Sequence, residues 1–202
     1  EKSESGMDPR TSFELVQTFK SFPETVRKVF ISPLLLVMFC LMYQGDKLIC
    51  TEWNSEWHVF SSFHQFLKTM MKLRAGEIVN SDIIIGKIME NLSKLSLQQL
   101  LQSSNELTEK AYDKFCSECY DKVSSDIPYA SVLSCVLNMR IAVGKSEKSW
   151  AFFHKSLQEY LAARYIVNEL ENLETDKQDN ENIFEEILIK CPGYCGRQSL
   201  ER

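Results

Sequence analysis

Apolar residues recur at three- and four-residue spacing along most of the chain, which is the spacing of one helix face. Proline, glycine and polar clusters interrupt this pattern and set the expected ends of the helices. A mainly α protein is therefore predicted. The polar residues 1–12 are expected to be a tail or linker, and residues 46–56 a loop. The expected helices run from Phe13 to Phe22, Val26 to Phe30, Pro33 to Gly45, Trp57 to Gly76, Ser81 to beyond Leu95, Thr108 to Cys119, Pro128 to Val136, and Ser156 to about Leu170.

The most apolar stretch lies between residues 29 and 43. Pro33 fits the first turn of a helix there, and Ser32 is placed to cap it. Apolar residues surround the expected helix, so we expect it to be buried on all sides. The stretch is shorter than the roughly 20 apolar residues that cross a bilayer, so no membrane span is predicted.

The second half of the chain predicts a small winged helix. Helices are expected to begin near Ser81, Thr108 and Pro128, and residues 137–143 and 150–153 are expected to form two strands joined by a polar turn. A long helix follows this hairpin at once. The expected fold is thus a helical domain, then a winged helix with a three-helix core and a small β-hairpin, then a further helical segment.

His154 is the main candidate for chemistry, because it stands between the second strand and the long helix. Ser156 and Glu159 match a capping box, so the helix is expected to begin at Ser156. Free backbone amides and the helix dipole at such an N-terminus attract anions. A histidine beside them can donate to a phosphate oxygen. The simpler alternative is a histidine that only packs at a strand–helix junction.

Composition and short motifs exclude several classes of function. The chain has seven glycines in 202 residues, about half the average usage of about 7%, so a self-contained phosphate-binding fold is not expected. Gly144-Lys145-Ser146 imitates the end of a phosphate-binding loop, but Met139 stands where that motif needs its first glycine. The net charge of −5 argues against a general nucleic-acid binder. The seven cysteines show no disulfide framework, and the CxxC pair at 116–119 lacks the second pair of a zinc site, so a reducing cytosol is expected.

Two motifs together resemble those of the NACHT-type signalling ATPases, the family of the NLR immune receptors. Residues 152–163, Phe-Phe-His-Lys-Ser-Leu-Gln-Glu-Tyr-Leu-Ala-Ala, resemble the family signature F-x-H-x-S-[FL]-Q-E-[FY]-[LF]-A-A. Residues 31–36, with Cys40 and Leu41, resemble the family's proline-plus-leucine helix, and the distance between the motifs fits. The resemblance implies a first helical domain at 13–76, a winged helix at 77–165, and the start of a second helical domain with an acidic segment at 166–202.

The resemblance also implies a function. The nucleotide-binding domain, with its phosphate-binding lysine and magnesium ligands, would lie in a parent protein outside this sequence. In that family Pro33 would lie against the adenine and sugar of bound ADP or ATP, and His154 would contact the β-phosphate of ADP. Exchange to ATP would release the winged helix and permit homo-oligomer formation in innate immune or cell-death signalling. No catalytic residue or metal ligand is assigned, and the chain alone is not expected to be an enzyme. A stand-alone helical adaptor and a winged-helix nucleic-acid binder are the other hypotheses.

Overall fold

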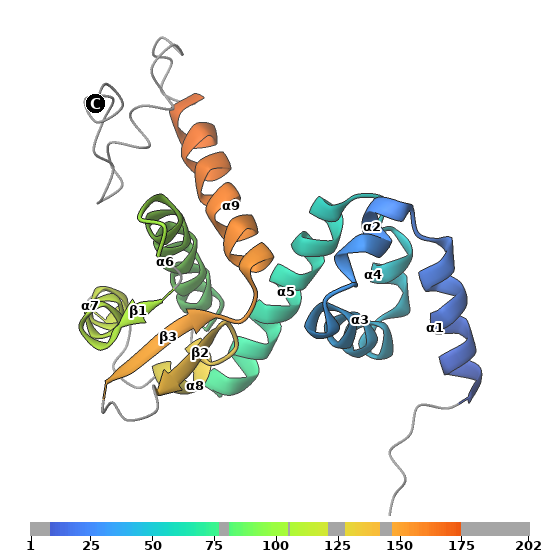
Figure 1. Ribbon diagram of the computed structural model, residues 1–202, viewed down its shortest axis with the longest axis horizontal. Coiled ribbons are helices and arrows are strands. Elements are labelled where there is room, and N and C mark those ends of the chain that lie inside the picture. The colour runs from blue at the N-terminus through green and yellow to red at the C-terminus, as the bar shows by residue number, and fades with distance from the viewer. Residues whose placement is uncertain (1–8, 77–80, 105, 121–127, 142–146, 175–202) are drawn as a thin grey trace, which may run out of the picture. The chain divides into compact units, whose positions relative to one another are not determined.

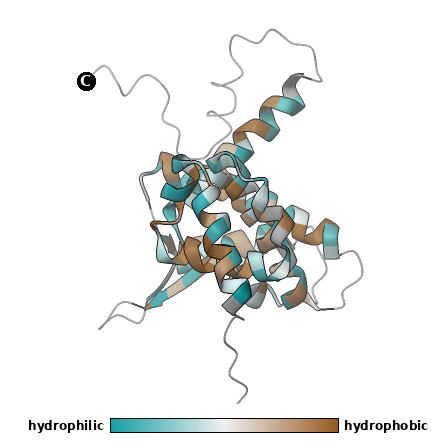
Figure 2. Ribbon diagram, turned by 90° about the vertical axis from the view of Figure 1, so that its right-hand side faces the viewer, coloured by the Kyte–Doolittle hydropathy of each residue, from teal (hydrophilic) through white to brown (hydrophobic). Residues whose placement is uncertain are grey.

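The computed structural model of the protein describes residues 9–76, 81–104, 106–120, 128–141 and 147–174. The chain is mainly helical with a small three-stranded antiparallel sheet, which confirms the predicted fold class (Figure 1). Apolar and polar residues alternate along the helices, as expected where one helix face is buried (Figure 2). The chain forms two compact units, Glu1–Phe66 and Leu67–Arg202. The division falls inside a helix that the sequence assigned wholly to the first domain.

The first unit contains short helices separated at the expected prolines. It holds α1 (Pro9–Ser21), α2 (Glu24–Val29), α3 (Pro33–Gly45), α4 (Lys47–Thr51) and the first part of α5 (Glu56–Ala75). Residues 9–12, expected to belong to a tail, are part of α1. The expected loop after α3 contains α4, because the Asp46 carboxylate caps that helix by accepting a hydrogen bond from the Leu48 amide at 2.9 Å.

Aromatic side chains fill the core of the first unit. Phe22, Phe30, Phe39, Trp53 and Phe63 are all buried. Their rings are stacked, edge-on or tilted: the Phe30 and Phe39 rings are tilted with centroids 5.2 Å apart, and the Phe30 and Trp53 rings are stacked at 5.8 Å. Such pairs add about 0.5–1.5 kcal/mol each beyond the burial of their area. The unit is therefore held mainly by ring packing.

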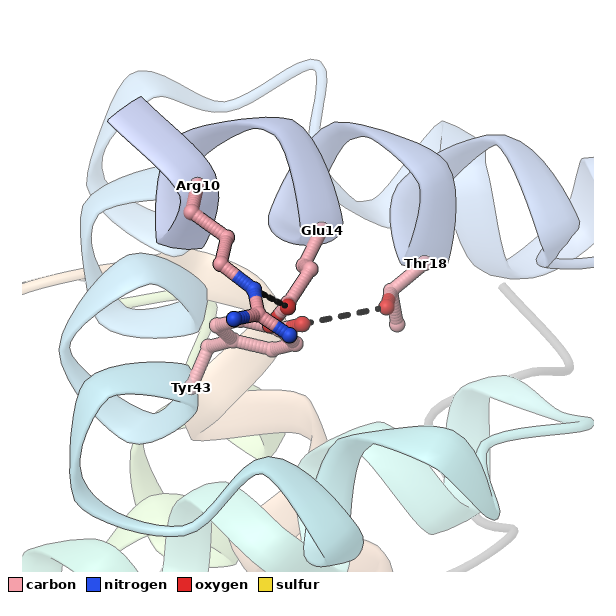
Figure 3. Close-up of polar contacts among 4 residues, drawn as sticks. All are labelled: Arg10, Glu14, Thr18 and Tyr43. Atoms are coloured by element: carbon pink, nitrogen blue, oxygen red, sulfur yellow. Dashed lines mark hydrogen bonds and ion pairs between the residues drawn. The ribbon is translucent and has the colours of Figure 1, made fainter. Parts of the chain in front are cut away.

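A hydrogen bond also joins α1 to α3 in the first unit. The Thr18 hydroxyl donates to the hydroxyl of the buried Tyr43 at 3.4 Å, so that a tyrosine of α3 has a partner on α1 (Figure 3). Beside it on α1, the Arg10 and Glu14 side chains form an ion pair at 3.3 Å. The ion pair is exposed and adds little stability.

Helix α3 is buried on one side only, so the prediction of burial on all sides is wrong. Leu35, Phe39, Met42 and Tyr43 face the core. Leu34, Val37 and Leu41 are 38%, 54% and 49% exposed, and they form what we call the outer face of α3. Apolar composition signals burial only where neighbouring elements exist to cover each side, and within the first unit the neighbours of α3 cover one side.

The second unit has the connectivity of a winged helix. The rest of α5 is followed by α6 (Ser81–Leu101), β1 (Leu107–Thr108), α7 (Glu109–Tyr120), α8 (Tyr129–Leu133), β2 (Leu137–Ile141), β3 (Lys148–Phe152) and α9 (Lys155–Glu174). The antiparallel strands lie in the order β1-β3-β2. The expected hairpin is β2 and β3, in which Met139 pairs with Trp150. Helices α6 and α9 lie side by side (Figure 1).

Strand β1 is absent from the sequence prediction. Leu107 and Thr108 were expected only as a helix start, and Thr108 does cap α7, accepting a hydrogen bond from the Ala111 amide at 3.3 Å. The same two residues also pair with Trp150 and Ser149 of β3. A strand of two residues has no periodicity to recognise, and it exists because β3 lies beside it.

None of the helices in the described part of the chain is long and apolar enough to cross a membrane.

Candidate functional site

His154 lies where the sequence placed it, between the end of β3 and the start of α9. The Phe153 amide donates to the Val136 carbonyl at 3.1 Å and so fixes the last turn out of the strand. The His154 side chain is half-buried. The junction is therefore held by the sheet on one side and by the helix on the other.

His154 itself caps α9. Its Nδ1 accepts a hydrogen bond from the Ser156 amide at 3.2 Å. Its carbonyl accepts from the amides of Leu157 and Gln158 at 3.1 and 3.2 Å. The amides of Ser156 and Leu157 are thus engaged within the chain, so the prediction that they are free to bind an anion is wrong for these two groups.

The predicted capping box does not begin this helix. Helix α9 starts at Lys155, one position before the expected Ser156, because His154 supplies the acceptor that the sequence assigned to Ser156. Glu159 lies 3.8 Å from the ammonium nitrogen of Lys155. This is an exposed ion pair of the first helical turn.

Sequence reasoning missed the role of Gln158. Its side chain is 3% exposed, and its Nε2 donates to Oε1 of Gln99, which is 4% exposed, at 3.2 Å. The pair joins the first turn of α9 to α6 across a mostly apolar interface. No local pattern identifies it, because the two residues are 59 positions apart in the sequence.

Pro33, the other predicted contact residue, lies in the first unit. It is the first residue of α3, as predicted, and it is exposed. Ser32 precedes the helix but its side chain makes no capping hydrogen bond, and its carbonyl accepts from the Leu36 amide at 3.0 Å. Pro33 and His154 belong to different units, so the structure describes the surroundings of each separately.

An open, charged groove of about 810 Å³ lies between the start of α7 and the wing. Its charged lining residues are Glu106, Glu109, Lys110, Asp113, Glu147 and Lys148. Glu106 pairs with Arg140 at 2.9 Å, and Glu109 lies 4.0 Å from Lys148. The excess of carboxylates makes this groove a poor surface for a phosphate backbone.

The described cysteines are free thiols. Burial raises the pKa of Cys50 to about 12 and that of Cys116 to about 11, so both are protonated at neutral pH. Cys135 is buried as predicted, whereas Cys40 is only half-buried. In the described ranges, no group of three or more His, Cys, Asp or Glu side chains could hold a metal ion. The Gly144-Lys145-Ser146 turn and most of the acidic segment lie outside the described residues.

No protein-family model matches this chain, and no curated protein matches it. The resemblance to the NACHT-type ATPases therefore stays a prediction carried by the two motifs.

Proposed function

We propose that this chain is the regulatory part of an NLR-like, NACHT-type signalling ATPase. In the parent protein it would sense the ADP or ATP state of a nucleotide-binding domain and control autoinhibition and oligomer formation in the cytosol. The observation that carries the proposal is the junction of a winged helix and a long helix with His154 at its centre. The family signature around His154 needs this strand-to-helix context.

The outer face of α3 supports the proposal, because it is an apolar surface that a partner domain could cover. Leu34, Val37 and Leu41 recur at i, i+3 and i+7 and are exposed within the first unit, directly after Pro33. Exposed apolar stripes of this kind mark interaction surfaces. On this proposal the nucleotide-binding domain of the parent protein covers the stripe, and Pro33 reaches the nucleotide from the same helix end.

The chemistry of the proposal is binding, not catalysis. The chain supplies a donor at His154 and an apolar surface at Pro33, whereas the phosphate cradle and the Mg²⁺ ligands belong to the parent protein. Release of the winged helix on exchange of ADP for ATP requires that the two nucleotides interact differently with the two conformations.

The test is His154→Ala in the parent protein, with Lys155→Ala as the control next to it. Lys155 is exposed, and among the described residues its side chain pairs with Glu159 at the surface. Purified His154→Ala protein should retain less ADP and form more oligomer by light scattering, whereas Lys155→Ala should behave like the wild type. Unchanged ADP content and unchanged oligomer size in His154→Ala would contradict the proposal.

The outer face of α3 also favours a second function, a stand-alone helical adaptor that binds a protein partner through this face. Size-exclusion chromatography of the 202-residue chain separates the two. Co-elution with an added nucleotide-binding domain of the parent protein favours the regulatory part, whereas a folded monomer that stays apart from that domain favours the adaptor.

A further inference from the structure

The ring of His154 has two nitrogens with different roles. Nδ1 accepts the Ser156 amide at 3.2 Å, and a nitrogen that accepts carries no proton. The proton of the neutral ring therefore lies on Nε2. Among the residues that the structure describes, none gives Nε2 a hydrogen-bond partner.

At this helix end the Lys155 amide has no hydrogen-bond partner among the described residues, whereas the next three amides do. The amides of Ser156, Leu157 and Gln158 all donate to His154. A phosphate oxygen that approaches α9 in this conformation would therefore find the Nε2–H group as a donor beside the Lys155 amide, with the next three amides already engaged. This differs from the usual binding of anions at helix N-termini, in which the amides themselves are the donors.

We propose that His154 is both the cap of α9 and a preset phosphate donor, because capping fixes the tautomer that presents Nε2–H. The inference rests on the proposed function, since it takes the phosphate of a nucleotide as the ligand. Turning the ring to present Nδ1 instead would break the cap. The ring is thus held in its donor orientation before any nucleotide binds.

The tautomer is measured on the 202-residue chain without nucleotide. Long-range ¹H–¹⁵N NMR distinguishes the two neutral tautomers, and the His154→Asn spectrum identifies the His154 signals among the three histidines. At about pH 8, His154 should show the Nε2–H tautomer. An Nδ1–H tautomer, or an equal mixture of the two, overturns the inference.

Three variants separate capping from donation. His154→Asp keeps an acceptor for the Ser156 amide but has no donor, His154→Asn keeps both, and His154→Ala keeps neither. The alanine variant should lower the equilibrium constant for folding of the second unit about fivefold. The aspartate and asparagine variants should stay close to the wild type. An alanine variant as stable as the aspartate variant overturns the capping role.

Nucleotide retention in the parent protein gives the other readout. The asparagine variant should keep part of the bound ADP, and the aspartate and alanine variants should lose it. If aspartate and alanine variants keep their ADP while the tautomer and stability results hold, the proposed function fails and the capping role stands. If the alanine variant loses ADP but the free chain shows mixed tautomers, the phosphate contact stands and the preset orientation is overturned.

Discussion

The buried pair of amides between α6 and α9 offers a sharp test of how the site is supported. Gln158 Nε2 donates to Gln99 Oε1 at 3.2 Å, and the two side chains are 3% and 4% exposed. We consider Gln158→Met, which keeps the length of the side chain and removes its hydrogen-bonding groups. The change leaves the Gln99 amide oxygen buried without this donor.

The expected loss of stability follows from the difference between leaving a buried polar group without a partner and making a hydrogen bond. A buried polar group left without a partner costs about 1–3 kcal/mol, whereas the net gain from a made hydrogen bond is nearer 1 kcal/mol. Each single change, Gln158→Met or Gln99→Met, should therefore destabilise the second unit by about 1–3 kcal/mol. The double change removes both polar groups at similar volume and should lie within about 1 kcal/mol of the wild type. The coupling energy should thus equal most of the sum of the single effects.

Hydrogen exchange of peptides from α6 and α9 measures this cycle, because it reports the opening of the second unit separately from the first. Gln98→Met, at a half-buried position beside Gln99, is the matched control and should change stability by less than about 0.5 kcal/mol. If the double variant is destabilised by the full sum of the single effects, the two amides do not act as a pair and the reasoning is wrong.

Two further predictions concern the first unit. Phe39→Ala should destabilise it by about 3–5 kcal/mol, because the side chain is fully buried among aromatic rings. Leu41→Ala on the outer face of the same helix should cost less than about 0.5 kcal/mol. Urea denaturation measures the free energy of unfolding of both variants, and equal losses would contradict the packing described. Burial raises the pKa of Cys50 from 9.0 to about 12, so iodoacetamide should label it far more slowly in the folded chain than in the unfolded chain at about pH 8. Since the unfolded thiol loses its proton first, the contribution of Cys50 to stability is full below pH 9.0 and falls as the pH rises toward 12. Mass spectrometry of the labelled peptide and urea titrations at rising pH check both, and rapid labelling of native Cys50 would refute the burial argument.

The sequence predicts the helices better than their surroundings. Pro23 separates α1 from α2 and Pro33 opens α3, because proline restricts the backbone wherever it stands. The burial of α3 depends instead on which neighbours exist, and composition does not contain that information. The same holds for β1, whose two residues are a strand only because β3 lies beside them.

In the candidate site, too, the sequence predicts local features and not the contacts that depend on the packed fold. The position of His154 at a strand–helix junction follows from local pattern, because a hairpin and a helix flank it directly. The hydrogen bond from Ser156 to Nδ1 depends on how the ring is rotated, and a linear motif does not specify that angle. The Gln99 partner of Gln158 comes from a distant helix, so only the packed fold brings the two amides together.

The contacts around His154 bear on how a ligand could act through it. The residue before it is tied to Val136 near the sheet, its own ring and carbonyl cap α9, and Gln158 in the first turn is tied to Gln99 of α6. Rotating the ring alone would break a helix cap that contributes about 0.5–2 kcal/mol. Shifting the start of α9 alone would leave the buried Gln99 side chain without its hydrogen-bond donor. A movement of the whole winged-helix unit breaks none of these contacts. On the proposed function, we therefore expect that loss of the phosphate contact makes the winged-helix unit move as one body. His154 would keep its position as the cap of α9 during this movement.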